Sequence, residues 1–204
     1  MVPLPARATA APAPDRRRVP PLVAVTLLAA AAGASACGLE DPSSISFRRG
    51  ALNIAYPQAL HVGTAVWQAQ AAGVVPPDAL LQRDDLAPEA RSTLRLLKAN
   101  ALMSQLAARL GDAPASGAGP RLAFVLLGPV LWTRFVPETG ALATRFHVPG
   151  PDPGDVVVVT DTSVVEAIVA GELTFAGALE GDLARLYGPT EIVATARQWL
   201  VGRH

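Results

Sequence analysis

Residues 156–173 read Val-Val-Val-Val-Thr-Asp-Thr-Ser-Val-Val-Glu-Ala-Ile-Val-Ala-Gly-Glu-Leu. The valine run at 156–160 is apolar on both faces, which predicts a short strand buried on both sides. Asp161 or Thr162 suits the cap of a helix over 163–170, and Gly171 suits its end. This stretch therefore predicts a buried strand that leads directly into a short capped helix.

The residues before this stretch have the pattern of a β-hairpin. Residues 121–136 are rich in Val, Leu, Phe and Trp and are interrupted at Gly128-Pro129. Residues 141–148 alternate between apolar and other side chains, and Pro-Glu-Thr-Gly at 137–140 separates the two segments. Strand patterns on either side of such a turn predict a pair of antiparallel strands.

Two further elements are expected after Gly171. We predict a strand over 177–186, bent at its glycines, and a closing amphipathic helix over 191–201. The apolar face of this last helix would consist of Ile192, Ala196, Trp199 and Leu200.

The first half of the chain is predicted to be helical. Pro57 suits the first turn of one helix, and a second helix starts after Asp85 and ends at Gly111. We therefore expect two packed helices over 57–111, a flexible linker over 112–120 and a small domain over 121–204. The expected fold class is α+β, in which a helical N-terminal half packs with a small, mainly antiparallel twisted sheet and its covering helices.

Two neighbouring segments carry a family resemblance. Residues 161–173, from Asp161 to Leu173, are followed by Gly-Ala-Leu-Glu-Gly-Asp at 177–182. With these segments, residues 122–202 resemble the sterol carrier protein type 2-like lipid-binding domain. The resemblance implies a twisted sheet covered by helices, with an apolar tunnel that holds a lipid or an acyl chain.

The lining of such a tunnel should come from inward strand faces and from the last helix. The expected lining residues are Phe124, Leu126, Trp132, Phe146, Val157, Ile168, Phe175 and Trp199. The same residues would serve an ordinary solid core, because a cavity and a packed core share one apolar signature.

The single cysteine, Cys37, follows the layout of an export signal. Arg16-Arg17-Arg18 precede an apolar run over 19–32, and Ala34-Ser35-Ala36 lead into the cysteine. A basic start, an apolar centre and small residues before a cut are typical of a secretory signal, here residues 1–36. A cysteine directly after the cut resembles the lipobox of bacterial lipoproteins, in which the thiol carries a diacyl anchor.

Two alternatives to a lipid anchor stay open. Ala34 and Ala36 also satisfy ordinary signal peptidase, which would release a soluble protein. The apolar stretch of about 18 residues is near the lower limit for an uncleaved membrane span. All three interpretations make 37–56 a tether and place the domain on the periplasmic side of a bacterial cell envelope. Gly38 in place of Asp favours outer-membrane delivery if the organism is Gram-negative.

The composition limits the choice of partners. The leader holds four arginines and one aspartate, so the remaining 168 residues carry a formal net charge of about −3. This charge argues against a nucleic-acid partner, since phosphate binding needs clustered Lys and Arg. One cysteine allows neither an intrachain disulfide nor a thiolate metal cluster, and no cofactor is expected.

No catalytic motif stands out in the sequence. The three histidines, at 61, 147 and 204, lack metal-ligand spacing, and no serine lies in a nucleophile elbow. The expected function is therefore that of a non-catalytic lipoprotein that binds an apolar ligand. The alternatives are an accessory or assembly factor that docks on an envelope protein complex through its helical half, and a small hydrolase or isomerase built on His61.

Overall fold

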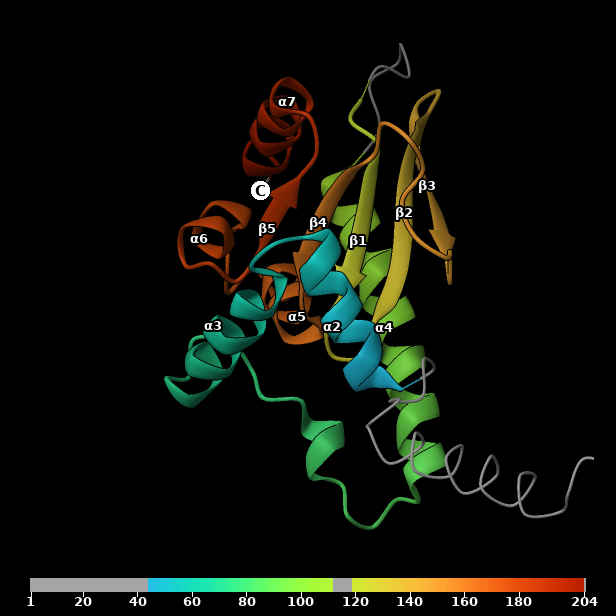
Figure 1. Ribbon diagram of the computed structural model, residues 1–204, viewed down its shortest axis with the longest axis vertical. Helices are drawn as coiled ribbons and strands as arrows, with labels where there is room; N and C mark the ends of the chain where they lie inside the picture. Colours follow the sequence, from blue (N-terminus) through green and yellow to red (C-terminus); the bar gives the residue numbers. More distant parts are fainter. Residues whose placement is uncertain (1–43, 112–118, 204) are drawn as a thin grey trace, which may run out of the picture. The chain divides into compact units, whose positions relative to one another are not determined.

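A computed structural model describes residues 44–111 and 119–203, and within them it has six α-helices, one 3₁₀ helix and five strands (Figure 1). The elements are α2 (Ile45–Ala55), α3 (Ala59–Ala71), η1 (Ala79–Gln82), α4 (Pro88–Leu110), β1 (Leu122–Leu126), β2 (Leu131–Glu138), β3 (Ala141–Phe146), β4 (Val156–Thr160), α5 (Thr162–Ala170), α6 (Phe175–Glu180), β5 (Arg185–Tyr187) and α7 (Thr190–Val201). The expected α+β class is confirmed. The predicted leader, Cys37, the start of the predicted tether and most of the predicted linker lie outside the described residues.

The five strands form one sheet in the order β3-β2-β1-β4-β5. Three neighbouring pairs are antiparallel, and β1 pairs with β4 in parallel. In that pair Phe124 lies beside Val158, and Leu126 lies beside Thr160. Every residue of β1 and β4 is buried, as the unbroken apolar run at 156–160 predicts for a strand covered on both faces.

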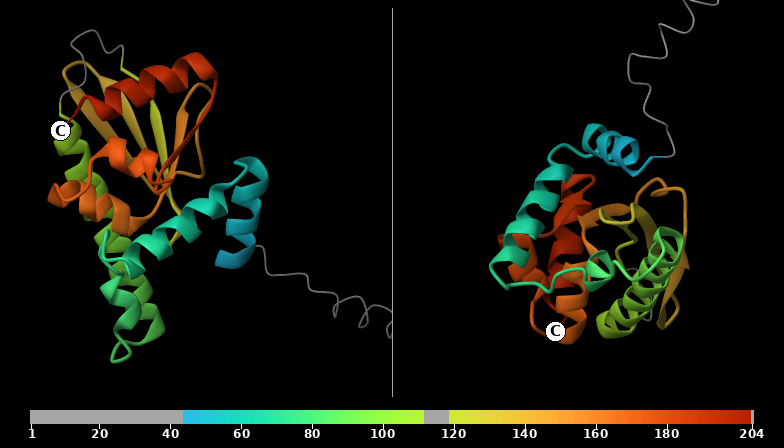
Figure 2. Two further views of the ribbon diagram at one scale, coloured as in Figure 1. Left: turned by 90° about the vertical axis from the view of Figure 1, so that its left-hand side faces the viewer. Right: turned by 90° about the horizontal axis from the view of Figure 1, so that it is seen from below.

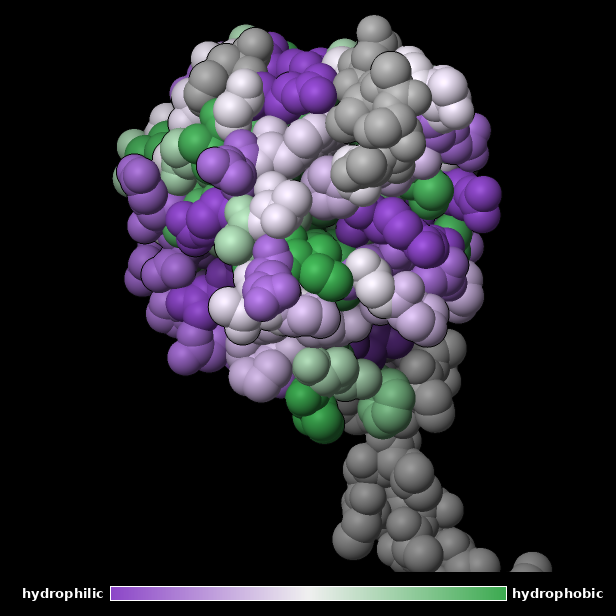
Figure 3. Space-filling model, turned by 90° about the horizontal axis from the view of Figure 1, so that it is seen from above, coloured by the Kyte–Doolittle hydropathy of each residue, from purple (hydrophilic) through white to green (hydrophobic). Residues whose placement is uncertain are grey.

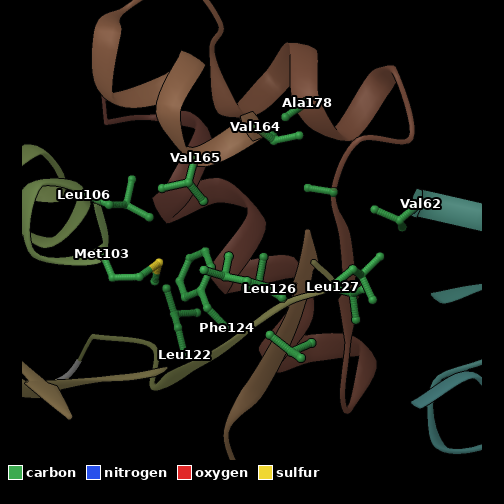
Figure 4. Packing of buried hydrophobic residues seen from close by; sticks show 14 of the residues in the cluster. Val62, Met103, Leu106, Leu122, Phe124, Leu126, Leu127, Val164, Val165 and Ala178 are labelled. Atoms are coloured by element: carbon green, nitrogen blue, oxygen red, sulfur yellow. The ribbon is translucent and has the colours of Figure 1, made fainter. Parts of the chain in front are cut away.

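Helices cover both faces of this sheet. In Figure 1, α4 lies behind the strands and α2 lies in front of them. The rear core is shown in Figure 4, where Leu122, Phe124 and Leu126 of β1 lie near Met103 and Leu106 of α4. These five side chains are all fully buried. The front face is covered by α2, α3 and α7, and Figure 2 shows α7 running across the strands.

Residues 45–55 were expected to belong to a tether, and this prediction is wrong because they form the helix α2. The hydroxyl of Ser44 caps the helix by accepting a hydrogen bond from the Phe47 N–H at 3.1 Å. Leu52 is buried against the rest of the fold at 6% exposure. The cap at Ser44 begins the helix, and Leu52 packs it against the fold. Arg48 and Arg49 of the same helix bind the turn between β1 and β2.

Both helices expected over 57–111 are present, but they do not form a packed pair. The first, α3, lies against α2 and β4, whereas α4 lies against β2, β3 and α5. Between them, residues 72–87 pass from one side of the sheet to the other and bury Val75 on the way. The two helices are separated because the sheet offers two apolar faces, and each helix covers one of them.

The strand predicted over 177–186 is also wrong. Residues 175–180 form α6, and only residues 185–187 pair with β4. Thr174 caps α6 by accepting a hydrogen bond from the Gly177 N–H at 3.0 Å. Phe175, Ala178 and Leu179 are then buried at helical spacing, so the glycines accompany a short capped helix rather than a bent strand.

A buried ion pair joins the hairpin to the loop before β4. Arg134 and Asp155 are 5% and 7% exposed, and Arg134 Nε donates to Asp155 Oδ2 at 2.6 Å. Arg121 Nε lies 3.0 Å from the other oxygen of Asp155, and Arg134 also reaches Asp152. The hydrogen bond to Asp155 raises the pKa of Arg134 above its ordinary value. The positive charge of Arg134 and the negative charge of Asp155 therefore neutralise each other, and Arg121 and Asp152 complete the cluster.

Replacing Arg134 by Met should lower the free energy of unfolding by about 3 kcal/mol, because it leaves the buried Asp155 without its main partner. Urea denaturation followed by circular dichroism measures this loss. Arg145 lies directly across the hairpin from Arg134 and is exposed, so Arg145→Met should change stability by less than about 0.5 kcal/mol. Equal losses in the two variants would contradict the proposed role of the pair.

Candidate ligand-binding groove

Two arginines of α2 hold the turn between β1 and β2. Arg49 donates from Nε to the Leu127 carbonyl at 2.9 Å and from Nη2 to the Gly128 carbonyl at 2.8 Å. Arg48 donates from Nη2 to the Val130 carbonyl at 2.6 Å. Three carbonyls that no strand partner reaches are thereby satisfied by charged donors, which form the stronger class of hydrogen bond. This clamp places α2 over the end of the sheet.

The clamped turn has an unusual backbone. Val130 has φ of +49°, a left-handed conformation that is a genuine outlier for a β-branched residue. Its side chain is only 3% exposed, so burial compensates part of the conformational cost. Its carbonyl is the one that Arg48 binds. Val130 is thus held by the burial of its side chain and by the hydrogen bond that its carbonyl accepts from Arg48.

Beside the clamp lies an apolar groove of about 620 Å³, which we call the α2 groove. Its walls come from one face of α2, the β1–β2 turn, the start of β2, the loop after β3 and one residue of α4. The lining residues are Phe47, Arg48, Ala51, Leu52, Ala55, Tyr56, Leu96, Pro129, Val130, Leu131, Trp132, His147, Val148, Pro149, Gly150 and Pro151. A volume of this size with mostly apolar walls is typical of a small-molecule site.

Aromatic rings form the inner end of the α2 groove. The rings of Tyr56 and Trp132 are 6.0 Å apart, and Tyr56 also packs on Tyr187 at 5.4 Å. The hydroxyl of Tyr187 donates to the Pro57 carbonyl at 2.7 Å. Burial raises the pKa of both tyrosines, so each phenol stays protonated over an even wider pH range than usual. This end of the groove is therefore uncharged.

The polar side chains of the α2 groove are few. Arg48 is engaged by the Val130 carbonyl, and His147 Nε2 lies 3.0 Å from the side-chain nitrogen of Asn100. Neither residue has a neighbouring nucleophile or a carboxylate among the lining residues. The arrangement can bind and orient an apolar molecule with a polar end, but it offers no acid–base pair.

A second groove, of about 430 Å³, opens where the parallel strands β1 and β4 end. Asp161 follows β4, and its Oδ2 accepts the Gly128 N–H at 2.8 Å. Arg95 crosses the groove and donates from Nε to Asp78 Oδ2 at 2.8 Å. Burial raises the pKa of Asp161, while hydrogen bonds from the Ser163 and Gly128 N–H groups oppose the rise. Asp161 thus caps α5 and fixes the turn, which is the cap predicted from the sequence.

The residues predicted to line one tunnel do not share one. The register places Phe124 opposite Thr133, so Phe124 and Leu126 face the rear of the sheet while Trp132 faces the front. Val157 lies opposite Tyr187 on that front face, and Phe146 lies opposite Thr133 on the rear. Since side chains alternate between faces, this set surrounds the sheet rather than a cavity.

The remaining predicted residues are divided in the same way. Ile168 and Phe175 together line a smaller pocket of about 360 Å³ beside Arg109. Trp199 lies half-buried on α7, where the guanidinium of Arg203 is 5.0 Å from its ring centre. Of the eight predicted residues, Trp132 lines the α2 groove. His61 is exposed on α3, and none of the clusters of His, Cys, Asp and Glu within the described ranges could hold a metal ion.

Sequence reasoning missed most of the α2 groove because it assigned α2 to a tether. Ser44 is a residue type that favours the N-cap, and this was the one local signal for the helix, since Phe47 contributes only its backbone N–H. The partners of Arg48 and Arg49 are about 80 residues away along the chain, so no local signal marks the clamp.

The described residues form an α+β fold with an apolar groove. No family model matches the chain, and no curated protein matches it. A solved structure of the inverting sec-alkylsulfatase Pisa1 from a Pseudomonas species is similar with 18% identity over 46% of this chain and 14% of that one, at a TM-score of 0.33. A double variant of the same sulfatase is similar with 19% identity over 56% of this chain and 16% of that one, at a TM-score of 0.37. The chain thus spans about a seventh of the length of these structures.

A Cβ at Gly128 would lie 3.1 Å from Arg95 Nη2 and 3.2 Å from Asp161 Oδ2, so these two side chains, which are held by Asp78 and by the Gly128 N–H, would have to shift. Gly128→Ala should lower the free energy of unfolding by about 1–2 kcal/mol. Gly63 is the matched control, since its Cβ would meet only Leu127 at 3.7 Å within a helix. Gly63→Ala should stabilise the protein by about 0.5 kcal/mol, and thermal melts of both variants check the opposite signs.

Proposed function

We propose that the protein is an extracytoplasmic lipoprotein, anchored in the cell envelope through Cys37, that binds a long-chain apolar ligand without catalysis. The observation that carries this proposal is the α2 groove, most of whose lining residues are aliphatic or aromatic, with Arg48 and His147 among them. A groove of about 620 Å³ buries an acyl chain or a molecule of similar size. The resemblance of residues 122–202 to the sterol carrier domain supports the same class of ligand.

The composition of the groove favours a chain with one polar end. Tyr56 and Trp132 provide uncharged aromatic surface at one end, where an apolar chain loses no hydrogen bonds on binding. Arg48 and His147 lie among the lining residues. Arg48 already donates to the Val130 carbonyl, so a polar headgroup would meet its positive charge beside that hydrogen bond. A fatty acid or a lysolipid has this chemistry.

The position of α2 in the sequence supports exchange of ligand with a membrane. Ile45 follows Cys37 by eight residues, which span at most about 28 Å when fully extended. A protein anchored at Cys37 therefore keeps the α2 groove within that distance of the lipid surface. Lipids could then reach the groove without a long passage through water.

Filling the groove should abolish uptake of ligand. Ala51 lines the groove from an exposed position on α2, so Ala51→Phe should block binding of a fluorescent long-chain fatty acid without unfolding the helix. Ile54 lies on the same helix at 85% exposure outside the groove lining, so Ile54→Phe should bind as the wild type does. Titration by energy transfer from tryptophan to the probe measures both affinities.

A second measurement addresses the ligand itself. Mass spectrometry of an organic extract of the purified protein should find a bound lipid in the wild type and less of it in Ala51→Phe. No extracted lipid together with no uptake of the probe would refute the carrier proposal. A stable protein partner in such preparations would favour the assembly-factor alternative instead.

The anchor has a separate test. Cys37→Ser removes the thiol that would carry the acyl groups, so the variant should move from the membrane fraction to the soluble fraction of fractionated cells. Metabolic labelling with a tagged fatty acid should mark the wild type alone. A variant that still sediments with membranes would favour the uncleaved apolar segment as the anchor.

A further inference from the structure

Exposed apolar side chains are distributed unevenly over the described residues. Eleven large hydrophobic residues are exposed, and ten of them lie between residues 45 and 97. The ten are Ile45, Phe47, Ile54, Leu60, Trp67, Val74, Leu81, Leu94, Leu96 and Leu97. The strands and the C-terminal helices over 119–203 contribute only Ile192. Single exposed hydrophobic residues are ordinary, but such a concentration marks an interaction surface.

These residues also gather in space. In Figure 1, α3, η1 and the first half of α4 form the lower end of the described fold, and α2 begins beside them. Leu60 and Trp67 of α3 line one groove together with Leu81 of η1. Phe47 and Leu96 line the neighbouring α2 groove. We call these five residues the apolar end. The opposite end, seen in Figure 3, is mostly hydrophilic.

The charges near the apolar end are already engaged. Within residues 44–98, Arg48 and Arg49 bind backbone carbonyls, and the other four cations pair with carboxylates. These pairs are Arg83–Asp85 at 2.7 Å, Arg91–Asp84 at 3.7 Å, Arg95–Asp78 at 2.8 Å and Lys98–Glu166 at 2.7 Å. A partner that binds here therefore gains little from charge and much from apolar contact.

We infer that the apolar end rests in the interface of a lipid bilayer. The inference goes beyond ligand binding and rests on the proposed envelope location for its setting. The chain enters the fold at Ile45, close to the predicted attachment point at Cys37, and it enters at the end of the fold where the exposed hydrophobic residues lie.

Contact with the bilayer is expected to be shallow. None of the helices among residues 44–111 and 119–203 is long and apolar enough to cross a membrane. Trp67, on α3, is 67% exposed, and an indole with one polar edge prefers the headgroup region. A diacyl anchor already supplies two chains, so side chains that enter only this region add to an existing attachment. The apolar end would thus fix how the domain lies on the bilayer.

The position of Trp67 is the decisive measurement. The full-length protein, purified and reconstituted in phosphatidylcholine vesicles, is compared in plain lipid and in lipid brominated on the acyl chains. Bromine quenches an indole that lies in the interface, so the wild type should lose tryptophan emission. Trp67→Phe should lose little, because it retains only Trp199, on α7, and Trp132, which is kept from brominated lipid by saturating the α2 groove with an unbrominated fatty acid. Equal quenching in the two proteins would overturn the inference.

Affinity for lipid gives an independent arm. Replacing both Trp67 and Leu81 by Ser should weaken partition into vesicles about tenfold, and Ile192→Ser should leave it unchanged. The partition should persist in 1 M salt, because apolar contact rather than charge drives it. Loss of the partition at high salt would overturn the inference. Acrylamide quenching of Trp67 in the absence of lipid gives a further check. If Trp67 is shielded from acrylamide there, a second copy of the chain covers it and the inference is overturned.

This design separates the two proposals. Quenching of Trp67 reports where the apolar end lies, whichever way the chain is attached. Metabolic labelling with a tagged fatty acid reports on the anchor alone, and uptake of the fluorescent fatty acid reports on the α2 groove alone. A protein that binds no fatty acid but shows quenched Trp67 would refute ligand binding and leave the membrane contact standing.

Discussion

Parallel strands cannot be joined by a tight turn, and in this protein β1 and β4 are separated by the entire β2–β3 hairpin. Their pairing constrains the rest of the structure. It buries both strands at the centre of the sheet, and it brings their carboxyl ends together. Gly128 and Asp161 meet at that edge, where one hydrogen bond ties the β1–β2 turn to the start of α5. The β1–β2 turn, which Arg48 and Arg49 of α2 bind, is therefore also held by Asp161.

The two grooves follow from this arrangement. One lies between α2 and the front of the sheet, and the other lies where the parallel strands end. The rear face of the sheet is filled by α4 and α5, with the rings of Phe124 and Phe135 in contact at 5.1 Å. The larger open space thus lies on the side that α2 covers incompletely, and ligand binding is proposed only for that side.

Sequence reasoning succeeded where the signals are local. The valine run and the cap at Asp161 predict β4 and α5 because burial and capping are both encoded within fifteen residues. It failed at α2, which depends on carbonyls far along the chain, and at α6, where glycines were taken for bends in a strand. The predicted tunnel failed for another reason. Whether Phe124 and Trp132 share a face depends on the register between two strands, which neither strand contains by itself.

The distance along the chain between α2 and its clamp also affects how the protein folds. Arg49 is synthesised 78 residues before the Leu127 carbonyl that it binds. Because a chain emerges from its N-terminus, α2 is complete long before the β1–β2 turn exists. During that interval Leu52 has no core to enter, and the front face of the sheet has not formed. The helix α2 therefore docks on the sheet only after the β1–β2 turn has formed, which makes its attachment a non-local step of folding.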